Sequence, residues 1–304
     1  MAEKREDIKH SKNLGTVGMI LQPFLIYYII RFITVVLLTY LVTITVQKAG
    51  GAVETLFAEQ KATVNAIIGG IAMLAGILPM FSDFRREVKN DNKCNYEKKK
   101  DKNNCHEINN NKVNNNVCNA GMVRTLFRIL ITITLAFASS IAINILFISF
   151  RLTENSASYS QVAAHQYGVF FPIGLFLYGV VSPLAEEIVF RGILYNRMKK
   201  MISAALSLVL SALLFGLYHG NTVQAAYGFL MGMLIAYTYE KCGDFLYAFL
   251  FHAAANISVY VITGSTVLYE WFITWQKGIL LAGISVMLLL FLHFRDSFRG
   301  CKEK

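Results

Sequence analysis

Residues 167–196 read YGVFFPIGLFLYGVVSPLAEEIVFRGILYN, and this stretch decides the fold class. A helix needs about 20 mainly apolar residues to cross the apolar core of a bilayer, and the stretch exceeds that length. Three charged side chains, Glu186, Glu187 and Arg191, lie within this apolar setting. Ionisable groups are costly inside a membrane and usually mark a functional site or a specific packing partner. The stretch therefore predicts a membrane-spanning helix that carries chemistry.

The rest of the chain has the same apolar character. Of its 304 residues, 55% are hydrophobic and only four are proline. In lipid, only helices and closed barrels satisfy their backbone hydrogen bonds, and the apolar runs lack the alternating pattern of barrel strands. The sequence thus predicts an all-α fold, a polytopic membrane helical bundle of about eight transmembrane helices. We expect these helices at 21–46, 62–81, 125–150, 167–196, 203–219, 222–240, 244–263 and 278–294.

The lysine and arginine residues between these runs predict the topology, because cytoplasmic loops are enriched in both. Basic residues gather before the first predicted helix, after the second, fourth and sixth helices, and at the end of the chain. The opposite side has only Lys48, Lys61, Arg151 and Lys277. Both termini are therefore expected in the cytoplasm. Since the net charge of +10 is spread over these loops, we expect a cell-membrane protein surrounded by membrane lipid, with no nucleic-acid partner.

Composition divides the chain into three parts. Residues 1–81 hold an N-terminal segment and the first two predicted transmembrane helices. Residues 82–122 are rich in Asn and Lys and contain few apolar residues able to anchor a core, so we expect a disordered cytoplasmic loop. Residues 123–304 hold helices three to eight, and the chemically informative residues fall in a catalytic core at 167–263.

The two adjacent glutamates differ in their helical positions. Glu187 and Arg191 stand four residues apart, so they can form an ion pair. Glu186 is rotated by about 100° around the helix axis and points elsewhere. One carboxylate is then neutralised by its partner while the other faces a cavity. The competing interpretation is a charge cluster at a cytoplasmic helix end, because three basic residues follow at 197–200.

Two later helices supply further polar side chains. The fifth predicted helix ends in His219, and the seventh contains His252 and Asn256 one turn apart, separated by three alanines that leave space beside them. If all helices run along the membrane normal, Glu186 and His252 lie roughly 12 to 20 Å deep but His219 lies about 24 Å deep. A tilted or recessed fifth helix must close that gap. Small residues on the sixth helix would let neighbouring helices approach closely: Gly228, Gly232 and Ala236.

Three short motifs occur in order along these helices: Glu-Glu-x-x-x-Arg, Phe-x-x-x-His and His-x-x-x-Asn. Together they resemble the CPBP family, the CAAX-protease and bacteriocin-processing family of intramembrane peptidases. The resemblance implies a bundle of about eight helices whose cavity faces the cytoplasm, and an endopeptidase that acts on a membrane-associated or lipidated peptide or protein. The matching residues are Glu186, Glu187, Arg191, Phe215, His219, His252 and Asn256.

The same resemblance implies a role for each residue. Glu186 would be the general base that activates water, helped by His219, while His252 and Asn256 would stabilise the oxyanion of the tetrahedral intermediate. The implied cofactor is either none or zinc, since one carboxylate and two imidazoles make an acceptable open zinc site. The zinc ligands would be Glu186, His219 and His252. The supporting residues would be Glu187, Arg191 and Phe215.

Two other functions are compatible with the sequence. A non-catalytic member of the same family would act as a bacteriocin-immunity protein or a membrane scaffold and would keep the same motifs. A proton-coupled transporter would also need Glu and His inside the membrane. Transporters are commonly built from inverted repeats, and the sequence shows no internal repeat, so the peptidase hypothesis is preferred.

Overall fold

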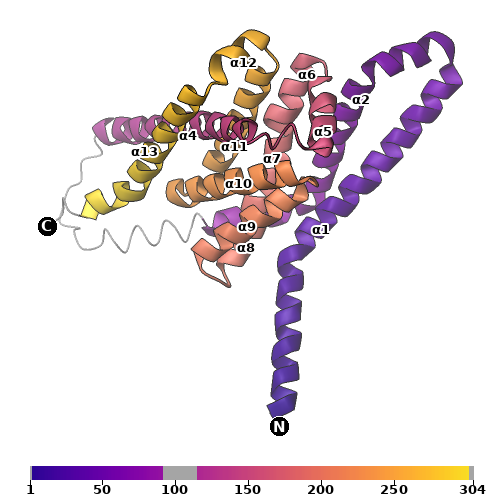
Figure 1. The fold of residues 1–304 in the computed structure, drawn as a ribbon. Helices are drawn as coiled ribbons and strands as arrows, with labels where there is room; N and C mark the ends of the chain where they lie inside the picture. The colour runs from indigo at the N-terminus through magenta and orange to yellow at the C-terminus, as the bar shows by residue number, and fades with distance from the viewer. Residues whose placement is uncertain (1, 92–114, 301–304) are drawn as a thin grey trace.

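The residues that the structure describes fold mainly into helices, joined by short turns. The computed structural model describes the backbone of residues 2–91 and 115–300 and the side chains of residues 18–91 and 122–294. Within these ranges no strand occurs, so the predicted all-α class is confirmed (Figure 1). The elements are α1 (Ala2–Ala49), α2 (Gly51–Ile77), η1 (Leu78–Met80), α4 (Asn115–Ser149), α5 (Ala157–Tyr167), α6 (Phe171–Phe176), η2 (Leu177–Val181), α7 (Ser182–Glu187), η3 (Ile188–Tyr195), α8 (Asn196–Lys199), α9 (Ala204–Tyr218), α10 (Thr222–Cys242), α11 (Phe245–Thr263), α12 (Thr266–Phe272) and α13 (Trp275–Gly300).

Over the described residues, six helices are long and apolar enough to cross a membrane. All eight predicted segments are helical, but α9 has only 15 residues and α10 is not among the six. The protein is therefore a multi-pass membrane protein, whereas the count of eight and the side on which the termini lie stay predictions. The six spans are Gly18–Ala49, Gly51–Asp91, Met122–Ser149, Phe171–Lys199, Phe245–Thr263 and Trp275–Phe294.

Two glycines turn the chain between α1 and α2. Gly50 has φ +57° and Gly51 has φ +54°, values in the left-handed region that residues with side chains rarely adopt. The two helices pack together as a hairpin whose turn reaches away from the rest of the bundle (Figure 1). The second helix does not stop at Ile77, because a continuous helical segment runs over Gly51–Asp91.

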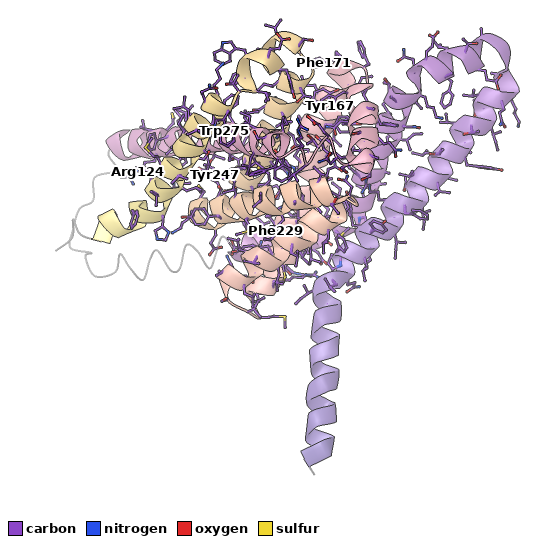
Figure 2. The ribbon with its side chains drawn as sticks, viewed as in Figure 1. Arg124, Tyr167, Phe171, Phe229, Tyr247 and Trp275 are labelled. Carbon is purple, nitrogen blue, oxygen red and sulfur yellow. The ribbon has the colours of Figure 1, made fainter. Side chains whose placement is uncertain are left out.

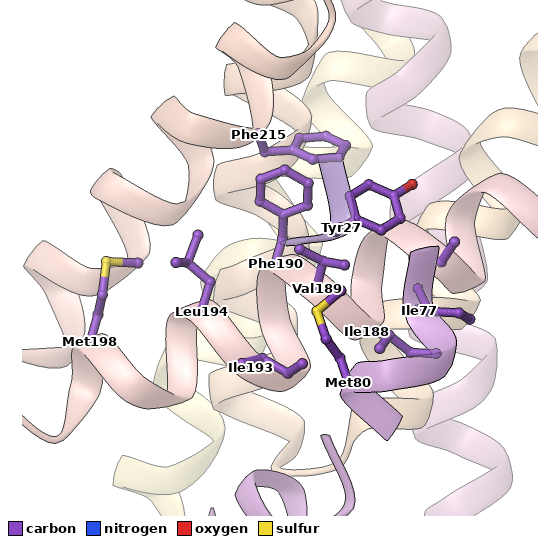
Figure 3. Packing of buried hydrophobic residues seen from close by; sticks show 11 residues of the cluster. Tyr27, Ile77, Met80, Ile188, Val189, Phe190, Ile193, Leu194, Met198 and Phe215 are labelled. Carbon is purple, nitrogen blue, oxygen red and sulfur yellow. The ribbon is translucent and has the colours of Figure 1, made fainter. Parts of the chain in front are cut away.

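A buried apolar cluster joins this hairpin to the helix that carries the glutamates (Figure 3). Tyr27 of α1 and Ile77 of α2 share the cluster with Val189 and Phe190 of η3, and all four side chains are buried. Phe190 meets Phe215 of α9 edge-on, with ring centroids 5.1 Å apart. Because four elements share one cluster, the helices around the candidate site are fixed relative to one another.

Acidic side chains correct the predicted boundary of the loop at 82–122. Residues 82–91 are helical, and Asp83, Glu87 and Asp91 recur every four residues, so they lie on one helix face. Asp83 pairs with Arg197 at 2.6 Å, and Asp91 pairs with Lys199 at 2.7 Å. These ion pairs anchor the segment together with Phe84, which packs on the apolar cluster and meets Phe245 edge-on. Composition alone indicated disorder because acidic and basic residues make most of these contacts. At the other boundary, α4 begins at Asn115, and residues 92–114 lie outside the described part of the chain.

α9 and α10 approach each other through glycine. A Cβ atom at Gly216 would lie 2.4 Å from the carbonyl oxygen of Ala225, so only glycine fits there. A Cβ atom at Gly228 would lie 3.3 Å from the Cα of Gly216. The expected close contact through Gly228 is therefore present, and it brings α10 against α9.

We expect Gly216→Ala to destabilise the protein by roughly 1–3 kcal/mol, because the new methyl group meets rigid backbone rather than a flexible side chain. Gly69→Ala is the matched control, since a Cβ atom there meets nothing within 4 Å. Thermal unfolding of both variants in detergent, followed by intrinsic fluorescence, measures the difference. Equal stability of the two variants would contradict the tight crossing of α9 and α10.

Candidate active site

The glutamate-bearing helix departs from regular α-helical geometry on both sides of Glu186. η2 and η3 are π-helical segments, a form that is rare and is often found at functional sites. In η2, the Ser182 N–H donates to Leu177 O, and Pro183 has no N–H to offer. The carbonyl of Tyr178 is thereby left without a partner in its own helix. Asn256 Nδ2 of α11 donates to this carbonyl at 3.0 Å, which fixes the amide one turn beyond His252.

Glu186 is held by a serine that the sequence interpretation did not assign. Ser182 Oγ donates to Glu186 Oε1 at 2.7 Å, one turn earlier in the same helix. The other oxygen, Oε2, lies 3.7 Å from His252 Nε2. Glu186 is 4% exposed and lines a cavity, so one oxygen is anchored while the second is free to act.

Glu187 and Arg191 form a fully buried ion pair, as their spacing predicts. Arg191 Nη1 donates to Glu187 Oε1 at 2.8 Å, and both side chains are 0% exposed. Arg191 Nη2 donates to the carbonyl of Gly232 at 2.9 Å, and the guanidinium lies 4.6 Å from the ring centroid of Phe215. Gly232 of the small-residue pattern thus also supplies an acceptor, which its sequence spacing does not indicate.

The same oxygen of Glu187 orients His252. The Nδ1 atom of His252 lies 2.8 Å from Glu187 Oε1. A carboxylate only accepts hydrogen bonds, so Nδ1 carries the proton and Nε2 faces Glu186. In the neutral ring Nε2 is an acceptor; in the imidazolium form it is a donor. Glu187 is therefore more than the partner of Arg191, because it also sets the tautomer of the imidazole beside Glu186.

The tautomer of His219 on α9 is likewise set by the acceptor next to its Nδ1 atom. Its Nδ1 atom lies 2.8 Å from the carbonyl oxygen of Phe215, which only accepts, so Nδ1 carries the proton and Nε2 keeps its lone pair. The Phe215 ring meets both imidazoles edge-on, with centroids 4.9 Å from His219 and 5.4 Å from His252. Phe215 thus fixes the orientation of both imidazole rings, which suits the supporting role expected for it.

One cavity of about 330 Å³ brings together the side chains expected to carry the chemistry. Its wall includes Glu186, His219, His252 and Asn256, whereas Glu187 and Arg191 do not line it. The depth expected for His219 is no obstacle, because α9 and α10 run across the direction of α2 (Figure 1) and length along α9 is not depth. The structure gathers the predicted residues; their catalytic roles stay predictions.

A comparison with protein-family models matches the part of the chain that contains these residues. Residues 168–258 match the model described as type II CAAX prenyl endopeptidase Rce1-like. This segment of the chain is similar to the CAAX-protease family. The resemblance inferred from three short motifs is thereby confirmed, and all of the motif residues lie inside the matched segment. Comparisons with curated proteins and with solved structures gave no match.

The cavity lies toward one end of the bundle. Its wall includes Thr153 and residues of α5, and a neighbouring hollow of about 380 Å³ shares Val162, Gln166 and Tyr178 with it. No residue of 187–214 or 232–251 lines it. Figure 1 shows α5, α6 and α12 at this end and α8 at the other. The sequence predicts cytoplasmic basic segments and termini, and the family resemblance implies a cavity that faces the cytoplasm. Since the cavity lies at the end opposite to the basic segments, these two expectations exclude each other.

Two short helices at this end were not predicted. α5 begins after Ser156, whose Oγ accepts from the N–H of Tyr159, a capping signal that the sequence does contain. Tyr167 of α5 and Phe171 of α6 (Figure 2) both stack on Tyr260, with centroids 5.6 Å and 5.5 Å away. Burial raises the pKa of Tyr167 to about 12, so its phenol adds no charge to the cavity. The second short helix is α12.

The donor set for a metal was tested against the geometry. Among the described side chains, no three His, Cys, Asp or Glu residues gather as a metal-ligand set. Glu186 and His252 approach each other, but His219 does not complete a group with them. The arrangement does not fit a three-ligand zinc site, and zinc dependence stays an untested prediction.

The two adjacent glutamates should respond differently to removal. Glu187→Ala leaves Arg191 charged, buried and without its carboxylate, which should cost roughly 3–5 kcal/mol. Glu186→Ala removes a group that faces the cavity and should leave the fold intact. Thermal unfolding and size-exclusion profiles of the two purified variants measure the difference. If both variants were equally stable, the structural role of Glu187 would be wrong.

Proposed function

We propose that the protein is an intramembrane endopeptidase that hydrolyses a peptide bond in a membrane-associated or lipidated peptide. The similarity of residues 168–258 to the CAAX-protease family supports a membrane protease in general. One observation carries the finer proposal: Glu186, His219, His252 and Asn256 surround a single cavity of about 330 Å³. A base, an acceptor for water and two candidate oxyanion donors thus face the same space, which is what acyl hydrolysis needs.

In the first step Glu186 acts as the general base. Its Oε2 takes a proton from a water molecule while the water oxygen forms a bond to the carbonyl carbon of the substrate. His219 Nε2 keeps its lone pair because Nδ1 donates to Phe215, so it accepts a hydrogen bond from the same water and orients it. The hydrogen bond from Ser182 keeps Glu186 in place throughout this step.

The negative charge then moves to the carbonyl oxygen. Asn256 Nδ2 has two protons, and only one is engaged by Tyr178 O, so the second can bind the oxyanion. Glu187 holds His252 through Nδ1, so Nε2 faces the cavity and donates to the oxyanion when both ring nitrogens carry a proton. Collapse of the intermediate breaks the C–N bond, and Glu186 returns its proton to the leaving amine.

We further propose that this cavity opens on the extracytoplasmic side. The distribution of Lys and Arg places the cavity outside the cytoplasm, whereas the family resemblance implies a cytoplasmic cavity. We follow the charge distribution because it is a property of this chain itself. Lys and Arg crowd the end of the bundle that carries Arg197 and Lys199, and the cavity lies toward the other end, beside α5. The expected substrate is then an exported or membrane-inserted peptide rather than a cytosolic prenylated protein.

Glu186→Ala should lower cleavage by at least about 100-fold, because a general base contributes on that scale. Purified protein in nanodiscs is incubated with lipidated and unmodified apolar peptides, and the products are identified by mass spectrometry. The matched control is Glu240→Ala, which removes a carboxylate that pairs with Lys199 away from the cavity. Activity should persist in a strong chelator.

The outcomes separate the alternatives. Cleavage that survives Glu186→Ala would contradict Glu186 as the general base. Cleavage that is lost in chelator and restored by zinc would contradict a metal-free mechanism. Wild-type protein without any cleavage would favour the non-catalytic immunity or scaffold hypothesis. Proton-coupled uptake in proteoliposomes would instead favour a transporter.

Cysteine labelling tests the side on which the cavity opens. In a variant whose five native cysteines are replaced, one cysteine is introduced at Gln161, which is exposed beside the cavity, or at Met201, which is 51% exposed near the basic end. A membrane-impermeant maleimide should label Gln161→Cys in intact cells and Met201→Cys only after lysis. The reverse pattern would show that the cavity faces the cytoplasm.

A further inference from the structure

Arg31 is the one cation in the wall of the cavity over the described residues. It lies in the middle of the apolar span Gly18–Ala49, where a charged side chain is costly without an interacting partner. Within the described part of the chain, Arg31 and Glu186 are the only Asp, Glu, Lys or Arg residues that line the cavity. An arginine in such a span commonly packs inside the bundle or extends toward the membrane interface, but the position of Arg31 in the cavity wall calls for another explanation.

Two tyrosines hold Arg31 in place. Tyr27 stands one turn before it on α1, so the two side chains share a helix face, and Tyr27 is 0% exposed in the apolar cluster. Arg31 Nη1 donates to the hydroxyl of Tyr218, and the Tyr27 hydroxyl lies 3.3 Å from that same hydroxyl. The guanidinium carbon is 5.2 Å from the Tyr218 ring centroid. The side chain is therefore positioned before any ligand arrives.

Most of the donors of Arg31 are still unused. A guanidinium has five N–H groups in a planar fork, and the one hydrogen bond that Arg31 makes among the described residues takes a single donor. No carboxylate among the described side chains pairs with it. Glu186 is engaged by Ser182 and faces His252 instead. A planar anion such as a carboxylate matches this free fork with two parallel hydrogen bonds.

We propose that Arg31 binds the terminal carboxylate of the peptide substrate. This inference rests on the proposed peptidase function, and it assigns the end of the substrate that enters the cavity. A carboxylate that enters alone would meet the like charge of Glu186 in an apolar surrounding, whereas Arg31 offsets that charge. The anchored carboxylate then fixes which peptide bond lies beside Glu186, so Arg31 is a specificity-determining residue.

Binding and cleavage are measured separately so that the two proposals can fail separately. Full-length Glu186→Gln protein in nanodiscs of neutral lipid is titrated with a fluorescent lipidated peptide as its free acid or its C-terminal amide. A third ligand is the amide of a peptide ending in glutamate. The free acid should bind about 10- to 100-fold more tightly than either amide, a range that follows from a charge-assisted hydrogen bond. Adding Arg31→Gln should abolish that difference.

Two further variants serve as controls. Arg31→Lys keeps the charge but loses the fork, so it should retain only part of the preference. Lys48→Gln removes a cation from the same helix outside the cavity and should change nothing. In the wild-type background, Arg31→Gln should raise KM for the free acid with little change in kcat.

The following results of the binding comparison overturn the inference. Equal binding of acid and amide, or a preference that survives Arg31→Gln, excludes Arg31 as the carboxylate site. Tight binding of the glutamate-ended amide would assign a side-chain carboxylate instead. Equal weakening of all ligands would give Arg31 a role in Glu186 electrostatics or folding. If no peptide is cleaved, the peptidase function fails while the binding comparison still decides on Arg31.

Discussion

One carboxylate oxygen, Oε1 of Glu187, is the interaction on which the site depends. It accepts from Arg191 and from His252, each at 2.8 Å, and Arg191 extends the network to the carbonyl of Gly232. Four elements, α7, η3, α10 and α11, are therefore tied through one buried network of charges. Inside an apolar bundle, loss of one charged partner destabilises the fold strongly, because it leaves the other charge buried and uncompensated. The geometry of the candidate site thus depends on a structural ion pair.

The second constraint is the covalent structure of Pro183, which has no backbone N–H. Pro183 cannot donate a backbone hydrogen bond, and the π-helical segment before it directs the Ser182 N–H to Leu177 rather than to Tyr178. A regular α-helix would satisfy the Tyr178 carbonyl within its own turn. Here that carbonyl is free to hold Asn256 of α11. The irregular helix therefore holds the Glu186 carboxylate through Ser182 and also orients the amide of Asn256.

Charge is separated between the two ends of the molecule. At one end, acidic residues on the helix over 81–91 neutralise Arg197, Lys199 and their neighbours and tie that helix to α8. At the other end lies the cavity, walled in part by α5, with Arg31 and Glu186 as its charged groups. The residues of these ion pairs and the charged residues of the cavity wall are therefore separate sets.

The sequence by itself determined the all-α membrane class, because the length and apolarity of the runs leave no other backbone able to satisfy itself in lipid. It also separated Glu186 from Glu187, because a rotation of about 100° per residue sends adjacent side chains in different directions. The three motifs indicated a resemblance to the CAAX-protease family, and a family comparison confirmed it over residues 168–258.

Only the tertiary structure decided which groups share a partner. Hydrogen bonds join residues far apart in the chain: His252 bonds to Glu187, and Asn256 donates to the carbonyl of Tyr178. Arg31 of α1 likewise lines the cavity beside residues of much later helices. Such contacts depend on how helices cross and in what register, which local periodicity does not encode. Composition likewise missed the helix over 82–91, because ion pairs and a single packed aromatic side chain, Phe84, anchor it.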